Sequence, residues 1–79
     1  MIKIYIYGCE CGVNGHLVRR VKAYGLQSGV SIEVFNTKYD VERRQEHDDY
    51  LKTAGLRRDY LLPIVVQDGI VEELRKWKS

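Results

Sequence analysis

Two cysteines separated by a single residue are the part of the sequence best suited to chemistry. Cys9 and Cys11 flank Glu10 in a turn-prone segment that runs from Gly8 to Gly15. An exposed thiolate with a second thiol in reach can exchange disulfides with another molecule. A disulfide between these cysteines closes a smaller ring than the C-x-x-C spacing does, so the backbone at Glu10 must bend. We therefore expect a reversible, relatively oxidising dithiol, or a single reactive thiol that a partner resolves.

The same residues permit two other interpretations. Thiolate and imidazole are good zinc ligands, and His16 follows the cysteines closely. A closed structural zinc site needs four ligands, however, and His47 lies far along the chain. Free cysteines can also be inert core residues. Two cysteines in one strand-to-helix loop are poorly explained in that way, so we favour redox chemistry and assign no metal ligand.

The charges around Cys11 oppose one another. A helix that begins after the cysteines would favour a thiolate at Cys11 by a few tenths to about 1 kcal/mol, through its free N–H groups and its dipole. Glu10 opposes this effect by like-charge repulsion, and a protonated His16 would support it. Because these contributions are comparable, the sequence predicts no thiolate pKa.

Three segments have the patterns of strands. Residues 2–7 and residues 31–35 alternate in side-chain character, with Tyr5 and Tyr7 on one face of the first segment. Residues 61–66 are a compact apolar run that suits a central strand. The only proline, Pro63, lies near the start of this run, where a strand tolerates it.

Two segments between these strands have helical spacing. The apolar positions are Leu17, Val18, Val21 and Tyr24 in the first segment and Val41, Tyr50, Leu51 and Ala54 in the second. Asn14 is the expected N-cap of the first helix and Gly25 its expected stop, although a start near Cys11 is also compatible. The second helix should follow the capping residues 36–40 and end at Gly55.

The last part of the chain predicts a hairpin. Gln67-Asp68-Gly69 is a tight-turn sequence, and Ile70 and Val71 begin the return strand. Residues 72–78 are helix formers, so a short terminal helix carrying Leu74 and Trp77 is expected. We expect Trp77 to fill the core beneath this segment.

Bulk composition limits the remaining possibilities. The 79 residues suffice for one domain, which we place at 1–79. A net charge of +2 is too small to argue for nucleic acid as a partner. No apolar run approaches the roughly 20 residues that span a bilayer, and residues 1–20 lack a signal-peptide pattern. We therefore expect a cytoplasmic monomer without a membrane partner.

The order of elements and two landmarks resemble the glutaredoxin family of the thioredoxin-like fold. The first landmark is Tyr5-Ile6-Tyr7-Gly8-Cys9-Glu10-Cys11 leading into a helix, and the second is Leu61-Leu62-Pro63-Ile64-Val65-Val66 followed by Asp68-Gly69. The resemblance covers essentially the whole chain. It implies an α/β fold of order β-α-β-α-β-β, with a mixed four-stranded sheet flanked by helices and a short or missing C-terminal helix.

The resemblance also implies roles for individual residues. Either cysteine can be the attacking thiol. We favour Cys11, with Cys9 as its resolver; in the reverse assignment Cys11 is a resolver one residue too close. Leu62 with a cis Pro63 would form the substrate shelf. The chain departs from the family in its C-x-C spacing, because Asn14 stands where the second cysteine would follow Cys11. A second departure is the sequence Val71-Glu72-Glu73-Leu74, which replaces the Gly-Gly pair that helps glutaredoxins bind glutathione.

Besides a metal-binding protein that uses Cys9, Cys11 and His16, two functions follow as expectations. The first is a thiol-disulfide oxidoreductase that acts on a disulfide-bearing protein, with electrons from glutathione or a reductase and no bound cofactor. Tyr7 would border its thiol site, and Arg58, with its neighbour Arg57, would meet a substrate carboxylate. The second is a non-catalytic adaptor that keeps the fold and binds a protein through its sheet edge or proline loop.

Overall fold

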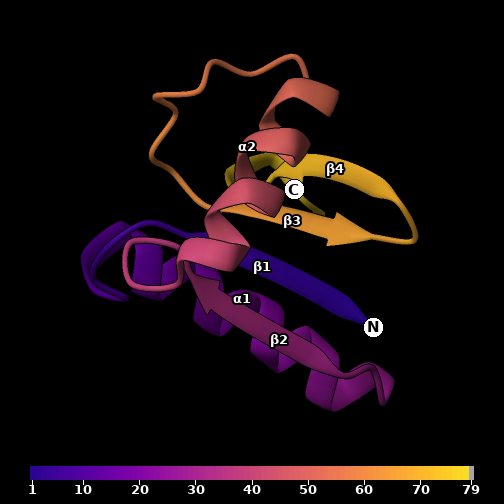
Figure 1. Ribbon diagram of the computed structural model, residues 1–79. Helices are drawn as coiled ribbons and strands as arrows, with labels where there is room; N and C mark the ends of the chain where they lie inside the picture. The colour runs from indigo at the N-terminus through magenta and orange to yellow at the C-terminus, as the bar shows by residue number, and fades with distance from the viewer. Residues whose placement is uncertain (79) are drawn as a thin grey trace.

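A mixed β-sheet lies between two helices in this protein (Figure 1). The computed structural model describes residues 1–78. The elements are β1 (Ile2–Ile6), α1 (Gly12–Ser28), β2 (Ile32–Asn36), α2 (Val41–Thr53), β3 (Ile64–Gln67), β4 (Ile70–Glu73) and the 3₁₀ turn η1 (Leu74–Lys76). The expected α/β class and element order are confirmed.

The strand order places β1 inside the sheet. The four strands run β2-β1-β3-β4, and β1 pairs parallel with β2 and antiparallel with β3. The parallel register joins Ile6 to Asn36, and the antiparallel register joins Tyr5 to Ile64. The mixed four-stranded sheet predicted from the sequence is therefore confirmed.

Each face of the sheet carries its own apolar cluster. The cluster beneath α1 contains Ile2, Ile4, Ile6, Leu17, Val18, Val21, Val65, Leu74 and Trp77. The cluster beneath α2 contains Tyr5, Leu51, Ile64 and Val66. Successive β1 side chains alternate between the two clusters, as a strand requires. Because both faces of the sheet are covered, every β1 side chain except that of Lys3 is buried.

The end of the described chain closes the α1 face. The predicted terminal helix is reduced to η1, because β4 continues to Glu73. Trp77 is only 5% exposed and meets the ring of Tyr24 edge-on at 5.1 Å between ring centroids. Arg20 donates hydrogen bonds of 2.8 Å to the carbonyls of both Leu74 and Trp77. The expected role of Trp77 as a core residue is confirmed.

The hairpin and the second helix follow their sequence signals. Asp68 and Gly69 have φ values of 52° and 78°, as a two-residue hairpin turn with positive φ at both positions requires. The side chain of Asp40 accepts a hydrogen bond from the Arg43 amide and caps α2. This helix ends at Thr53, just before Gly55.

The expected stop of the first helix at Gly25 is wrong. The helix starts at the earlier of its two predicted positions, with Cys11 as N-cap, and runs through Gly25 to a cap at Gly29. Asn14 consequently lies inside the first turn and not at the cap. A Cβ at Gly25 would lie 2.6 Å from Ile32 Cγ1 and 2.8 Å from the Val30 carbonyl oxygen. This glycine is therefore needed for the close approach of α1 to the chain entering β2.

Neither helix within residues 1–78 combines the length and hydropathy needed to cross a bilayer.

Replacement Gly25→Ala tests that close approach. Alanine favours a helix interior over glycine by about 1 kcal/mol, so an open site would be stabilised. Overpacking against Ile32 and the Val30 carbonyl should outweigh this gain and lower the free energy of unfolding by about 1–3 kcal/mol. Urea unfolding measures the change. The exposed Gln27→Ala in the same helix should change stability by less than about 0.5 kcal/mol. Equal or higher stability of Gly25→Ala would contradict the packing described here.

Candidate functional site

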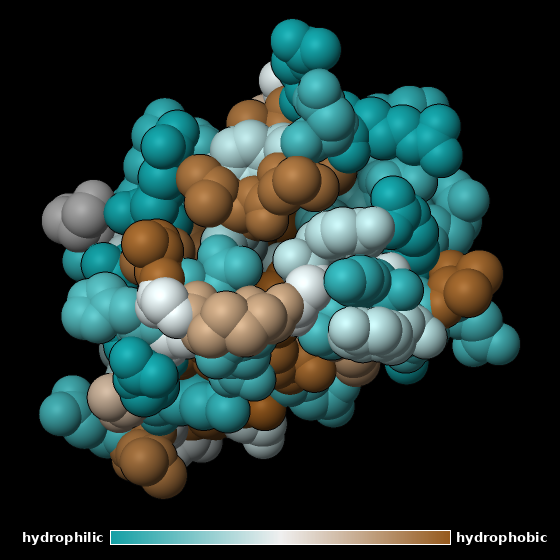
Figure 2. Space-filling view, turned by 90° about the vertical axis from the view of Figure 1, so that its left-hand side faces the viewer, coloured by the Kyte–Doolittle hydropathy of each residue, from teal (hydrophilic) through white to brown (hydrophobic). Residues whose placement is uncertain are grey.

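The candidate site lies at the end of the sheet where β1 and β2 finish and β3 begins. Continuing the β1–β3 register by one pair beyond Tyr5 and Ile64 brings Pro63 beside Ile6. The loop of residues 7–11, which we call the cysteine loop, follows Ile6 directly, so both sequence landmarks lie at this end of the sheet. Figure 2 faces this end of the sheet and shows hydrophobic and hydrophilic side chains interspersed over it.

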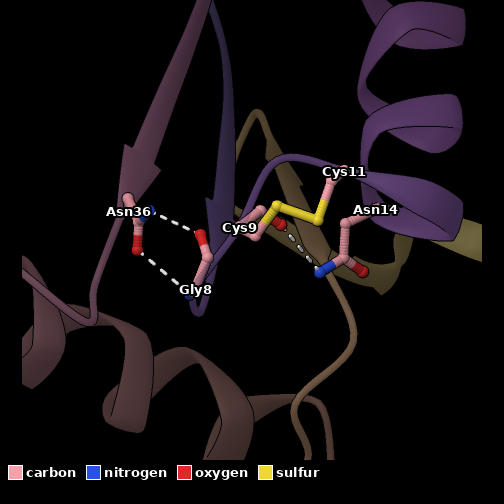
Figure 3. The surroundings of a disulfide bond; sticks show 5 residues. All are labelled: Gly8, Cys9, Cys11, Asn14 and Asn36. Carbon is pink, nitrogen blue, oxygen red and sulfur yellow. Dashed lines mark hydrogen bonds between the residues drawn. A yellow bond between two sulfur atoms is a disulfide. The ribbon is translucent and has the colours of Figure 1, made fainter.

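Cys9 and Cys11 form a disulfide on the surface of this end (Figure 3). Both residues are exposed, and their Cα atoms lie 5.2 Å apart, inside the usual range for a bridged pair. The chain bends at Glu10, as the one-residue spacer requires. An exposed bridge can be attacked by an external thiolate without local unfolding.

Asn36 holds the backbone that leads into the disulfide. Its Oδ1 accepts a hydrogen bond of 3.1 Å from the Gly8 amide, and its Nδ2 donates one of 2.5 Å to the Gly8 carbonyl. Figure 3 shows the side chain lying alongside Gly8 with both bonds in place. The amide group of Asn36 thus replaces the strand pairing that ends at Ile6 and fixes the chain one residue before Cys9.

The position of Cys11 favours a thiolate when the bridge is open. Cys11 is the N-cap of α1, and no side chain caps the first-turn amides of this helix. Unpaired N–H groups at a helix start stabilise negative charge. Glu10, which opposes this effect, forms an exposed ion pair of 3.5 Å with Lys22. Because Cys9 precedes the helix, Cys11 lies closer to these amides.

Buried hydrogen bonds of Thr37 and His47 support the end of β1 from the α2 side. Thr37 is 1% exposed and His47 is 5% exposed. The Thr37 hydroxyl donates a hydrogen bond of 3.1 Å to the Ile6 carbonyl and lies 2.9 Å from His47 Nδ1. A hydroxyl has a single proton, so His47 Nδ1 must carry the proton of the second bond. Nε2 of His47 is then the unprotonated nitrogen, and it is buried without a partner.

Burial lowers the pKa of His47 below its usual value and outweighs the opposing effect of the Asp48 carboxylate, while Arg44 adds a smaller lowering effect. The neutral form of the ring is also the one that fits its single hydrogen bond. His47 therefore acts here as a neutral structural group that joins α2 to the end of β1.

A second polar contact joins α2 to the face of β1. The Tyr5 hydroxyl donates a hydrogen bond of 2.9 Å to Glu46, which also pairs with Arg43. Burial and this hydrogen bond raise the pKa of Tyr5 above its usual range. The hydrogen bond from Arg43 lowers the pKa of Glu46, so this carboxylate remains charged and accepts both bonds.

The remaining predicted site residues divide into two groups. Pro63 is buried and Leu62 is half-buried, both directly before β3. The Leu62–Pro63 bond is trans, so the cis bond implied by the resemblance is wrong. Tyr7 and Arg58 line one open groove together with Arg44.

His16, the histidine nearest the cysteines in sequence, is exposed on α1. Within residues 1–78, no three or more side chains that could bind a metal ion lie together.

Sequence reasoning missed Asn36, Thr37 and His47 as supports of the site. Asn36 was expected only to cap a helix, and His47 only to be remote from the cysteines. The available signal was the adjacency of Asn36 and Thr37 to the end of a strand parallel to β1. The carboxyl ends of such strands lie at one edge of the sheet.

No protein-family model matches the chain, and comparison with curated proteins and with solved structures found no significant match.

Replacement Asn36→Ala should loosen the cysteine loop. Two backbone hydrogen bonds of Gly8 are lost, at about 1 kcal/mol each. We expect a loss of about 1–3 kcal/mol in unfolding free energy and faster amide hydrogen exchange at Gly8, read by NMR. The matched control is Asn14→Ala, since Asn14 makes only an exposed 3.4 Å bond to the Cys9 carbonyl. An Asn36 variant with unchanged Gly8 exchange would refute the positioning role.

Stability should fall on acidification because of His47. Its pKa in the folded protein lies below the value of about 6.5 in the unfolded chain, so the unfolded chain binds the proton more tightly. The stabilising contribution is complete above about pH 6.5 and is lost as pH falls toward the folded pKa. Urea unfolding between about pH 8 and about pH 5 measures this slope.

The chain contains only two histidines, which supplies a direct control. His16→Gln should keep the pH slope, because this side chain is exposed. His47→Gln should flatten the slope over the same interval. An unchanged slope in the His47 variant would assign the effect to another group.

Proposed function

We propose that this protein is a thiol-disulfide oxidoreductase that acts through Cys9 and Cys11. The observation that carries the proposal is an exposed disulfide directly before α1, at the sheet end where Pro63 leads into β3. An exposed pair at a helix start meets the two requirements of exchange chemistry, access and a stabilised thiolate.

The reaction moves two electrons and two protons. In the reducing direction, the Cys11 thiolate attacks one sulfur of a substrate disulfide, and the other sulfur leaves as a thiolate that takes a proton. Cys9, after losing its proton, attacks the Cys11 sulfur of the mixed disulfide. The substrate is released as a dithiol, and the Cys9–Cys11 bond re-forms. Glutathione or a dithiol reductase then supplies two electrons to reopen it.

The order of attack rests on the N-cap position of Cys11. Helix amides favour the Cys11 thiolate over that of Cys9, which makes Cys11 the attacking group and Cys9 the resolver. Leu62 and Pro63, directly before β3, are the proposed substrate shelf. We place the reaction in the cytoplasm, where reductants keep the cycle running, and treat the monomer as the working unit.

The arrangement supports a thioredoxin-like fold of the glutaredoxin type. Helices on opposite faces of a mixed sheet, a cysteine loop after β1 and a hairpin of β3 and β4 agree with the resemblance. The one-turn η1 agrees with a truncated last helix. The trans bond at Pro63 and the C-x-C spacing are departures from the glutaredoxin pattern.

These departures favour one rival, a protein-binding adaptor whose disulfide only rigidifies the loop. The outer strands β2 and β4 each have one unpaired edge within the described chain, which a partner strand can extend. The two functions differ in whether the disulfide turns over.

Trapping experiments with the two serine variants separate these functions. The reduced wild-type protein should reduce a disulfide-bonded peptide, and Cys9→Ser should accumulate a mixed disulfide through Cys11 because no resolver remains. Cys11→Ser should form this adduct about two- to fivefold more slowly, since its remaining thiol lacks the helix start. Mass spectrometry measures the adducts, and urea unfolding shows whether each variant is folded. An inert wild-type protein would support the adaptor.

A further inference from the structure

An open groove lies beside the disulfide end of the sheet. Its volume is about 640 Å³, and it is lined by Tyr7, Arg44, Arg57, Arg58, Asp59 and Leu61. We call it the arginine groove. Three of its lining side chains carry a positive charge and one carries a negative charge, so its lining is cationic.

The cations of the arginine groove are incompletely neutralised. Arg44 forms no ion pair within residues 1–78, and its guanidinium lies 4.8 Å from the centre of the Tyr7 ring. Arg57 pairs with Asp59 at 3.3 Å, where both side chains are more than two-thirds exposed. Arg58 lies 3.5 Å from Asp48 and is itself 83% exposed. Exposed pairs of this kind are weak, so these arginines can exchange their partners for an incoming carboxylate.

Residues that line the groove are close in sequence to the disulfide and to Pro63. Tyr7 lies two residues before Cys9, and Leu61 lies two residues before Pro63. Two residues span at most about 7 Å of backbone, and an extended peptide advances about 3.3 Å per residue. When the cysteine of an extended substrate reaches the disulfide, the substrate residues about two to four positions from that cysteine would therefore lie in the groove.

We propose that the arginine groove selects protein substrates with Asp or Glu about two to four residues from the reacting cysteine. This inference rests on the proposed exchange function and names its substrate class. The occupant is an acidic polypeptide segment, because the groove combines cations with the apolar Leu61 and the ring of Tyr7. Arg44 can donate hydrogen bonds to a carboxylate while it stays stacked on Tyr7.

The first test compares two disulfide-bonded peptides of equal length. One carries glutamate three residues from its cysteine, and its partner carries glutamine there. The wild-type protein should reduce the acidic peptide faster, by about two- to fivefold for each arginine engaged, and added salt should remove the difference. Arg44→Gln should lower the preference by about that factor, whereas Arg75→Gln, on η1, should leave it unchanged.

The second test separates recognition from redox chemistry. A serine analogue of each peptide cannot exchange disulfides, so its binding is followed by NMR at Tyr7 and the arginine side chains. Binding of the acidic analogue alone, lost in a protein with Arg44, Arg57 and Arg58 all replaced by glutamine, would support the groove even if no exchange occurs. Equal exchange rates with both peptides, or no binding of the acidic analogue, would overturn the groove inference and leave the exchange function standing.

Discussion

The burial of β1 on both faces is the constraint on which the rest of the structure depends. One face of this strand packs Ile2, Ile4 and Ile6 beneath α1, and the other packs Tyr5 beneath α2. A strand covered in this way must find all its backbone partners in neighbouring strands, which β2 and β3 provide. Its carboxyl end is consequently fixed in three dimensions. The cysteine loop leaves from that fixed end, so the two sulfurs of the disulfide are exposed although the backbone just before them is held.

Polar side chains continue the pairing where the strands stop. Asn36 takes the place of a strand partner for Gly8, and Thr37 joins the Ile6 carbonyl to His47. These groups come from β2, the following loop and α2, so three elements hold one strand end. The proposed chemistry benefits because an attacking thiolate must approach along a defined direction. The arginine groove lies at the same end, so recognition and exchange would share one rigid support.

Periodicity predicted the elements but not their limits. The alternation in residues 2–7 and the Asp68-Gly69 turn are local signals, and both gave the correct structure. Gly25 was misread as a helix stop because glycine signals both a stop and a close contact. The contact that decides between them comes from Ile32, on a neighbouring element. The cysteine pair was found from its spacing, whereas its supports were not, because Asn36 and His47 are remote from Cys9 in sequence.

The sequence by itself determined the element order, the mixed sheet and the proximity of two cysteines to a helix start. These properties follow from patterns of a few neighbouring residues, and such patterns are present in the sequence before the chain folds. Only the tertiary structure decided which polar groups secure Gly8, which nitrogen of His47 holds its proton and which arginines share a groove. Such outcomes depend on residues brought together by the sheet register. A strand pairing shifted by one residue would turn each side chain of that strand to the opposite face of the sheet and break these contacts.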